Sequence, residues 1–76
     1  MELSNFIENF SDQFEKTLSV ALAADTNFRE LDEWSSIVAL SVMAMCDEEY
    51  DVQLKADEMR KANTIGELFE IVKSRA

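Results

Sequence analysis

The chain has 76 residues, of which 47% are hydrophobic, so it is long enough for one small domain and too short for two. It holds one cysteine, one glycine, no histidine and no proline, which excludes an internal disulfide, a zinc finger, a histidine-based catalytic site and glycine-rich loops for nucleotide phosphates. Sixteen acidic residues against seven basic ones give a net charge of -9, so the surface repels nucleic acids and anionic membranes and attracts basic protein surfaces.

The first predicted element is an amphipathic helix over about residues 3–17. Its apolar side chains recur at helical spacing and form one stripe, made of Leu3, Phe6, Ile7, Phe10 and Phe14. A long connection follows, with a turn predicted at Asp25-Thr26-Asn27 because short polar side chains bond to nearby backbone. We expect the connection to pack against the core through Leu22, Phe28, Leu31 and Trp34.

Ser35 is expected to cap a second helix over residues 36–50, since a serine hydroxyl can accept a hydrogen bond from a first-turn amide. One face of this helix is apolar along its length and is expected to lie in the core: Ala39, Val42, Met43, Cys46 and Tyr50. The opposite face begins with Ile37 and Leu40 and ends in acids that cannot be buried unpaired, so it is expected to face solvent and dock partners. Alternatively, the preceding connection folds over Ile37 and Leu40 and makes them core. Met45 lies between the two faces, where it can fill the core or touch a partner.

Two further helices complete the chain. A short one is expected over residues 55–61 with Met59 inward, and a last one over residues 65–74, where Thr64 and Glu67 have the spacing of a capping box. No segment alternates with a period of two, so strands are not expected. The sequence therefore predicts a small all-α, four-helix bundle, with three main helices, one short helix and a long connection between the first and second, as a single domain over residues 1–76.

The longest nearly apolar stretch, residues 37–46, is far shorter than the ~20 residues of a membrane-spanning helix. The N-terminal residues lack the basic start and apolar run of a signal peptide. We therefore expect a cytoplasmic protein without a membrane segment. Cys46, on the apolar face of the second helix, is expected to be a buried small hydrophobe rather than a reactive thiol.

Three segments together resemble a known family. Residues 28–37 lead to a serine at the start of the second helix, residues 47–52 give that helix an acidic end, and residues 64–68 open the last helix. In the order of these segments, in its length and in its acidity, the chain resembles the acyl carrier proteins. Their prosthetic-group serine lies in an Asp-Ser-Leu motif at the start of the second of four helices. The likeness spans essentially the whole chain.

The resemblance implies that Ser36 carries 4'-phosphopantetheine as a phosphodiester and that the thiol of this arm holds acyl groups as thioesters. The protein would then be a carrier and a substrate of partner enzymes, not an enzyme, and is expected to act as a monomer in fatty-acid synthesis or a related acyl-transfer pathway. A phosphopantetheinyl transferase would attach the group from coenzyme A, and acyl-transfer and synthase enzymes with basic docking surfaces would be its partners.

The same resemblance suggests two further sets of residues. The partner-docking set is Asp32, Glu33, Ile37, Leu40, Ala44, Asp47, Glu48 and Asp51. The set expected to line a site for the acyl chain within the bundle is Val42, Cys46, Leu54, Met59 and Phe69.

The motif departs from the family pattern at several positions. Ser35 stands where the motif has its acid, and Ile37 where it has leucine. Val38 and Ser41 occupy positions that are often acidic in fatty-acid carriers, so the upper half of the docking helix is less charged. These differences suggest a specialised set of partners, or a cargo other than a growing fatty acid.

Two other functions fit parts of the pattern. An acidic helical adaptor without a prosthetic group would explain the exposed face of the second helix, but not the serine pair that opens it. A calcium loop would use Asp47, Glu49, Asp51 and Glu58, yet Val52 stands where such a loop needs glycine for its sharp turn. We therefore expect no metal site.

Overall fold

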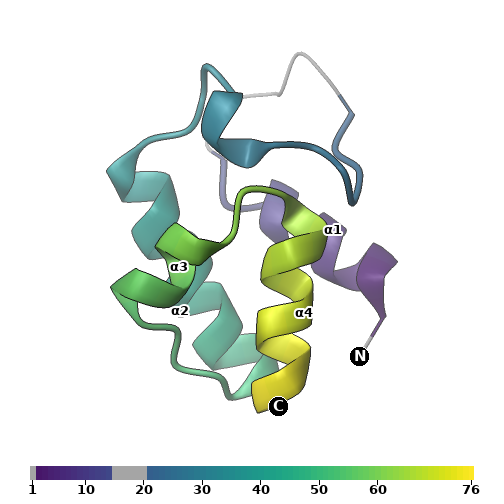
Figure 1. Ribbon diagram of the computed structural model, residues 1–76, viewed down its shortest axis with the longest axis vertical. Coiled ribbons are helices and arrows are strands. Elements are labelled where there is room, and N and C mark those ends of the chain that lie inside the picture. Colours follow the sequence, from purple (N-terminus) through teal and green to yellow (C-terminus); the bar gives the residue numbers. More distant parts are fainter. Residues whose placement is uncertain (1, 15–20) are drawn as a thin grey trace.

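The computed structural model describes residues 2–14 and 21–76. Over these residues the chain forms four α-helices, one short 3-10 helix and no named strand. They are α1 (Leu3–Ser11), η1 (Phe28–Glu30), α2 (Ser36–Tyr50), α3 (Ala56–Lys61) and α4 (Ile65–Arg75). The predicted all-α bundle of three main helices and one short helix is confirmed, and α1 packs beside α4 and α2 (Figure 1). In the described ranges, no helix has the length and apolar character needed to cross a membrane.

Helix α1 is shorter than the sequence pattern predicted. It ends at Ser11, after which the amides of Gln13 and Phe14 donate to carbonyls three residues back, at Phe10 and Ser11. Phe14 is nevertheless buried, because this tighter turn still brings its ring to the apolar stripe. The spacing thus identified buried residues but not the end of the helix. Residues 15–17 of the predicted helix lie outside the described residues.

The core is rich in aromatic side chains from α1, the connection and α4. Phe6, Phe10 and Phe28 are fully buried. The ring of Trp34 lies parallel to that of Phe10, with centroids 6.0 Å apart, and 4.7 Å from that of Phe28. Trp34 is therefore the packing anchor that the sequence predicted.

The described part of the connection is bound to the start of α4. The amides of Ile65 and Gly66 donate to the carbonyls of Thr26 (3.2 Å) and Ala24 (2.8 Å), and the amide of Phe28 donates to the carbonyl of Asn63 (3.2 Å). A Cβ at Gly66 would lie 3.0 Å from the Ala24 oxygen, so this close approach accounts for the chain's single glycine.

Helix α2 has the predicted bounds, and of its predicted core face Val42 and Cys46 are fully buried. The residues buried on it are Val38, Val42, Met45 and Cys46, whereas Ala39, Met43 and Tyr50 are half-buried. Apolar residues surround most of this helix, so their spacing alone does not locate the centre of the buried arc. In the folded chain that arc extends to Val38 and Met45. Met45 is therefore core and not a partner contact, and Val38 is not a surface position.

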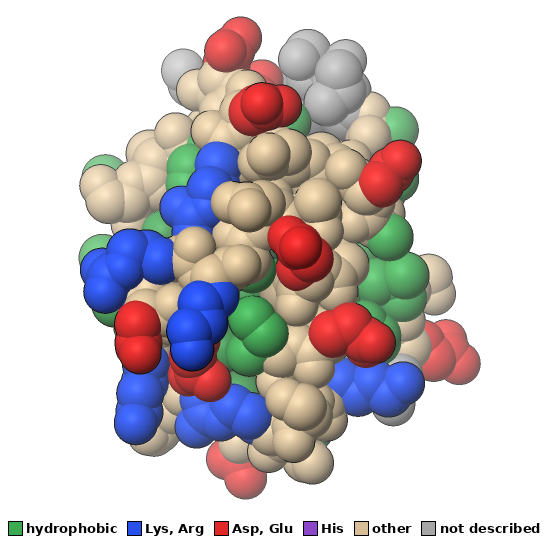
Figure 2. All heavy atoms as spheres, viewed as in Figure 1, with side chains coloured by type: hydrophobic (Ala, Val, Ile, Leu, Met, Phe, Trp, Pro, Cys, Tyr) green, Lys and Arg blue, Asp and Glu red, His purple; other side chains and the backbone are tan. Residues whose placement is uncertain are grey.

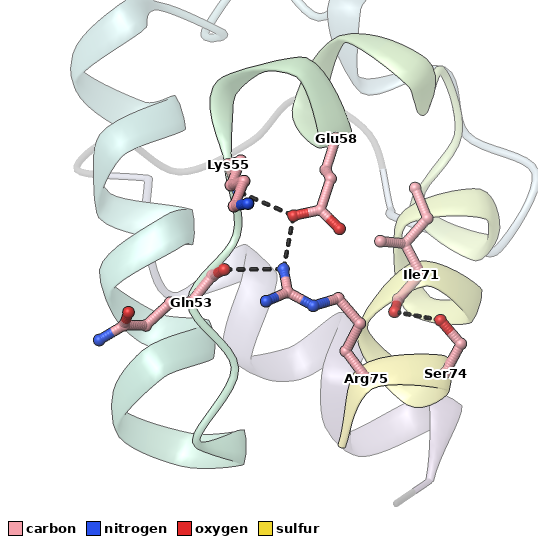
Figure 3. A network of polar contacts seen from close by, with 6 residues as sticks. All are labelled: Gln53, Lys55, Glu58, Ile71, Ser74 and Arg75. Atoms are coloured by element: carbon pink, nitrogen blue, oxygen red, sulfur yellow. Dashed lines mark hydrogen bonds and ion pairs between the residues drawn. The ribbon is translucent and has the colours of Figure 1, made fainter.

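Side-chain hydrogen bonds cap the start of α4 and join its end to α3. Thr64 Oγ1 accepts from the Glu67 amide (3.1 Å), while Glu67 Oε1 accepts from the amides of Thr64 (3.0 Å) and Asn63 (2.8 Å), which confirms the capping box. Arg75 donates to the carbonyl of Gln53 (2.8 Å) and to Glu58 Oε1 (2.5 Å), as Figure 3 shows. These contacts fix the end of α4 against α3 and the segment before it.

Candidate functional site

Two consecutive serines at the start of α2 have different surroundings. Ser35 is extended and lies outside the helix, where its Oγ accepts from the Val38 amide at 3.3 Å and its carbonyl accepts from the Ala39 amide at 2.9 Å. The predicted N-cap is therefore confirmed. Ser36 is the first helical residue, its side chain is exposed, and its hydroxyl makes none of the hydrogen bonds found among the described residues.

The first turn of α2 favours an anion next to Ser36. The amides that open a helix have no intrahelical acceptor, and the aligned peptide dipoles place about half a positive charge there. The first turn of α2 contains no acidic residue of its own. A phosphodiester on Ser36 would therefore be attracted by the helix end rather than repelled by a neighbour in the same turn.

The surface formed by Ile37, Leu40, Ala44, Asp47, Glu48 and Asp51 is called here the outward face of α2. All six side chains are exposed, and the large apolar ones are 72% exposed at Ile37 and 65% at Leu40. The prediction that this face meets solvent is confirmed, and the alternative that the connection covers Ile37 and Leu40 is wrong. The physical reason is the anchoring of the connection on α4. Of the other two residues expected to meet partners, Asp32 is exposed and Glu33 half-buried.

All five residues expected to line an acyl site are buried in one hydrophobic core: Val42, Cys46, Leu54, Met59 and Phe69. The burial predicted for Cys46 is confirmed, and desolvation raises the pKa of its thiol to about 12. Because the thiolate is the nucleophilic form, this side chain is chemically inert at neutral pH.

Among the clefts on the described surface, two lie beside α2, and neither is lined by those five residues. The larger, of about 470 Å³, lies beside Ser36 and is called here the α1–α2 cleft. Its lining is Gln13, Phe14, Asp32, Glu33, Trp34, Ser35, Ile37, Val38 and Ser41. The smaller, of about 380 Å³, runs between α1 and the lower half of α2.

Sequence reasoning missed the α1–α2 cleft, although it named several of its residues for other reasons. Phe14 belonged to the apolar stripe of the first helix, and Trp34 was the expected anchor of the connection. The two meet at the start of α2 because the chain turns after Ser11 and the ring of Trp34 packs against Phe14, with centroids 6.3 Å apart. Only the tertiary path brings them together.

The acids considered for calcium are not assembled into a site. Within residues 2–14 and 21–76, no group of three or more Asp, Glu, Cys or His side chains is placed to hold a metal ion. Asp51 ends α2 in the left-handed conformation, with φ 56°. This conformation turns the chain so that the Val52 amide donates to the Cys46 carbonyl, and the helix terminates there.

Comparison with known protein families gives one match over most of the chain. The model of a family described as "Phosphopantetheine attachment site" matches residues 8–72. The match includes the serine pair, all of α2 and α3, and most of α4. No significant match was found among curated proteins or solved structures.

Proposed function

The chain belongs to the phosphopantetheine attachment site family, whose domains bear covalent 4'-phosphopantetheine and act as carriers, and from this premise we propose that Ser36 is the attachment residue. The observation that carries this assignment is the contrast within the serine pair. Ser35 uses its hydroxyl to cap α2, whereas Ser36 presents an exposed hydroxyl at the first helical position.

Attachment requires a general base that takes the proton of the Ser36 hydroxyl. The sequence contains no histidine, and Ser36 has no side-chain base among its described hydrogen-bond partners. A phosphopantetheinyl transferase would therefore remove the hydroxyl proton while Ser36 Oγ attacks the phosphorus of coenzyme A that bears pantetheine, and the bond from this phosphorus to the bridging oxygen of the pyrophosphate breaks. The new bond joins Oγ to phosphorus, and the adenosine bisphosphate portion leaves. This division of labour makes the chain a substrate and carrier of partner enzymes, not an enzyme.

Once attached, the group supplies a thiol that can hold an acyl chain as a thioester and present it to acyl-transfer and synthase enzymes of fatty-acid or related pathways. The exposed acids Asp32, Asp47, Glu48 and Asp51, with the half-buried Glu33, would attract basic rims of these enzymes over long range. Ile37, Leu40 and Ala44 would then give a small apolar contact that releases quickly. Such brief contacts suit a carrier that must visit several enzymes in turn.

The buried set Val42, Cys46, Leu54, Met59 and Phe69 remains the proposed lining for a longer acyl chain. These side chains are packed together, so an alkyl chain could enter only if the helices separate. Family membership favours this carrier function over an adaptor without a prosthetic group.

The test is intact mass after incubation with coenzyme A and a phosphopantetheinyl transferase. We expect the wild-type chain and Ser35→Ala to gain one phosphopantetheine and Ser36→Ala to gain none, while circular dichroism shows that all three retain the helical fold. Modification of Ser36→Ala, or an unmodified wild-type chain, would overturn the assignment. Loss of modification in Ser35→Ala alone would move the attachment site by one residue.

A further inference from the structure

The α1–α2 cleft borders the proposed attachment residue directly, because both sequence neighbours of Ser36, namely Ser35 and Ile37, belong to its lining. Its volume of about 470 Å³ falls within the range of roughly 300 to 1,000 Å³ that is common for small-molecule sites. A flexible arm attached to Ser36 could therefore fold back into this cleft without any separation of the helices.

The cleft has an apolar wall and a polar rim. Phe14 and Val38 are buried, Trp34 is half-buried, and the three side chains give the wall two aromatic rings and a branched aliphatic group. Trp34 is held by its parallel contact with Phe10, so the wall is preformed. Such a surface suits a short apolar group.

The charge of the lining limits which groups can enter. Asp32 and Glu33 contribute carboxylates, and none of the described residues that line the cleft is a lysine or an arginine. A cargo that ends in its own carboxylate would lose hydration and meet two like charges there. An uncharged cargo meets neither cost.

We propose that the α1–α2 cleft is a cargo site, in which the arm on Ser36 shelters a short acyl group that bears no negative charge. This inference rests on the proposed function, since it requires the arm. The α1–α2 cleft would be a second site for cargo, distinct from the buried set in the core. It would also select cargo by charge.

Trp34 is the only tryptophan of the chain and lines the cleft, so its fluorescence reports directly on occupancy. The transferase would load the chain from coenzyme A, butyryl-coenzyme A or malonyl-coenzyme A. Butyryl and malonyl groups have similar size but differ in that malonyl ends in a carboxylate. We expect the butyryl form to show a blue shift and weaker acrylamide quenching than the unacylated holo form, and the malonyl form to match the holo form.

Three variants sharpen this test. Ser41→Leu, which fills the cleft from α2, should abolish the butyryl-dependent shift. Ser74→Leu makes the same change at an exposed position of α4 outside the cleft and should retain it. The double variant Asp32→Asn, Glu33→Gln should give the malonyl form the shift seen with butyryl.

Intact mass separates failure of this inference from failure of the proposed function. If the arm does not attach, the proposed function fails. If mass confirms the butyryl form but Trp34 fluorescence is unchanged, or if Ser41→Leu keeps the full shift, the cleft is not the cargo site. An equal blue shift of Trp34 fluorescence in the malonyl and butyryl forms of the wild-type chain would overturn the selection by charge. This comparison does not depend on the folding of any variant.

Discussion

The outward face of α2 and the α3–α4 region differ in how far contacts within the chain hold them in place. In the α3–α4 region, Thr64 and Glu67 cap α4, and Arg75 binds Glu58 and the Gln53 carbonyl. On the outward face of α2, Ile37 and Leu40 leave most of their surface to solvent. The chain therefore places much of its stabilising polar contact on one side and leaves an unpartnered apolar surface on the other.

Charge separates the same two regions. Residues 53–76 hold five basic and four acidic residues, whereas residues 1–52 hold two basic and twelve acidic residues. Basic side chains gather on the side of the molecule where α3 lies (Figure 2). All of the excess negative charge thus belongs to residues 1–52, which contain α2, so long-range attraction draws a basic partner to that part of the chain.

The largest expected difference between the hydrophobic core and the outward face of α2 is in how much their side chains contribute to stability. Phe10 is fully buried and packs against Phe6, Phe14, Phe28 and Trp34. Phe10→Ala should lower the free energy of unfolding by about 3 to 5 kcal/mol, because it leaves a cavity among rings, whereas Leu40→Ala should change it by less than about 0.5 kcal/mol. Urea unfolding followed by circular dichroism measures both. A large loss in Leu40→Ala would mean that the outward face contributes to the fold.

The same Leu40→Ala variant should have its effect on partner recognition. We expect the specificity constant of the transferase for this variant to fall about fivefold to tenfold, about 1 kcal/mol, because an exposed apolar contact is lost at the docking surface. Lys73→Ala, at an exposed position of α4, serves as the control and should be modified at the wild-type rate. Equal rates for all three proteins would show that the transferase docks elsewhere.

How far the sequence could predict this structure depends on whether a feature is local. The caps at Ser35 and Thr64 and the start of α2 follow from interactions within one turn, and each was predicted at the correct residue. The burial of Phe6, Phe10 and Phe28 followed from apolar spacing or from a long connection that must cover the core.

Features set by tertiary packing were missed or misplaced. The buried arc of α2 includes Val38 and Met45 beside the predicted Val42 and Cys46, because apolar residues lie around most of this helix and their spacing does not decide which of them are buried. The α1–α2 cleft was not foreseen at all, since Phe14 and Trp34 meet only through the folded path of the connection. Ser36 was singled out from its place in the motif and the helix, which are both local.

A smaller effect should distinguish the two capped helices. Thr64 takes part in a reciprocal box, whereas Ser35 accepts one bond at 3.3 Å. Thr64→Ala should therefore cost about 1 kcal/mol of unfolding free energy and Ser35→Ala about 0.5 kcal/mol. Thr64→Ser, which keeps the hydroxyl, is the matched control and should stay close to wild type. Equal losses of unfolding free energy in both alanine variants would show that the hydrogen bonds accepted by Glu67 stabilise the start of α4 even without the Thr64 hydroxyl.

The smallest effect is the pH dependence that Glu67 gives to the α3–α4 region. Hydrogen bonds from the backbone amides of Asn63 and Thr64 lower the pKa of this carboxyl in the folded chain. A carboxyl whose pKa is lower in the folded than in the unfolded chain stabilises the fold at pH values above the unfolded pKa of 4.5. This stabilisation is lost as the pH falls through the folded pKa. The free energies of unfolding of wild type and Glu67→Gln should therefore differ most above the unfolded pKa of 4.5 and converge as the pH falls through the lower folded pKa, because glutamine has no charge to lose. A constant difference across that range would mean that the amide bonds to Glu67 do not depend on its charge.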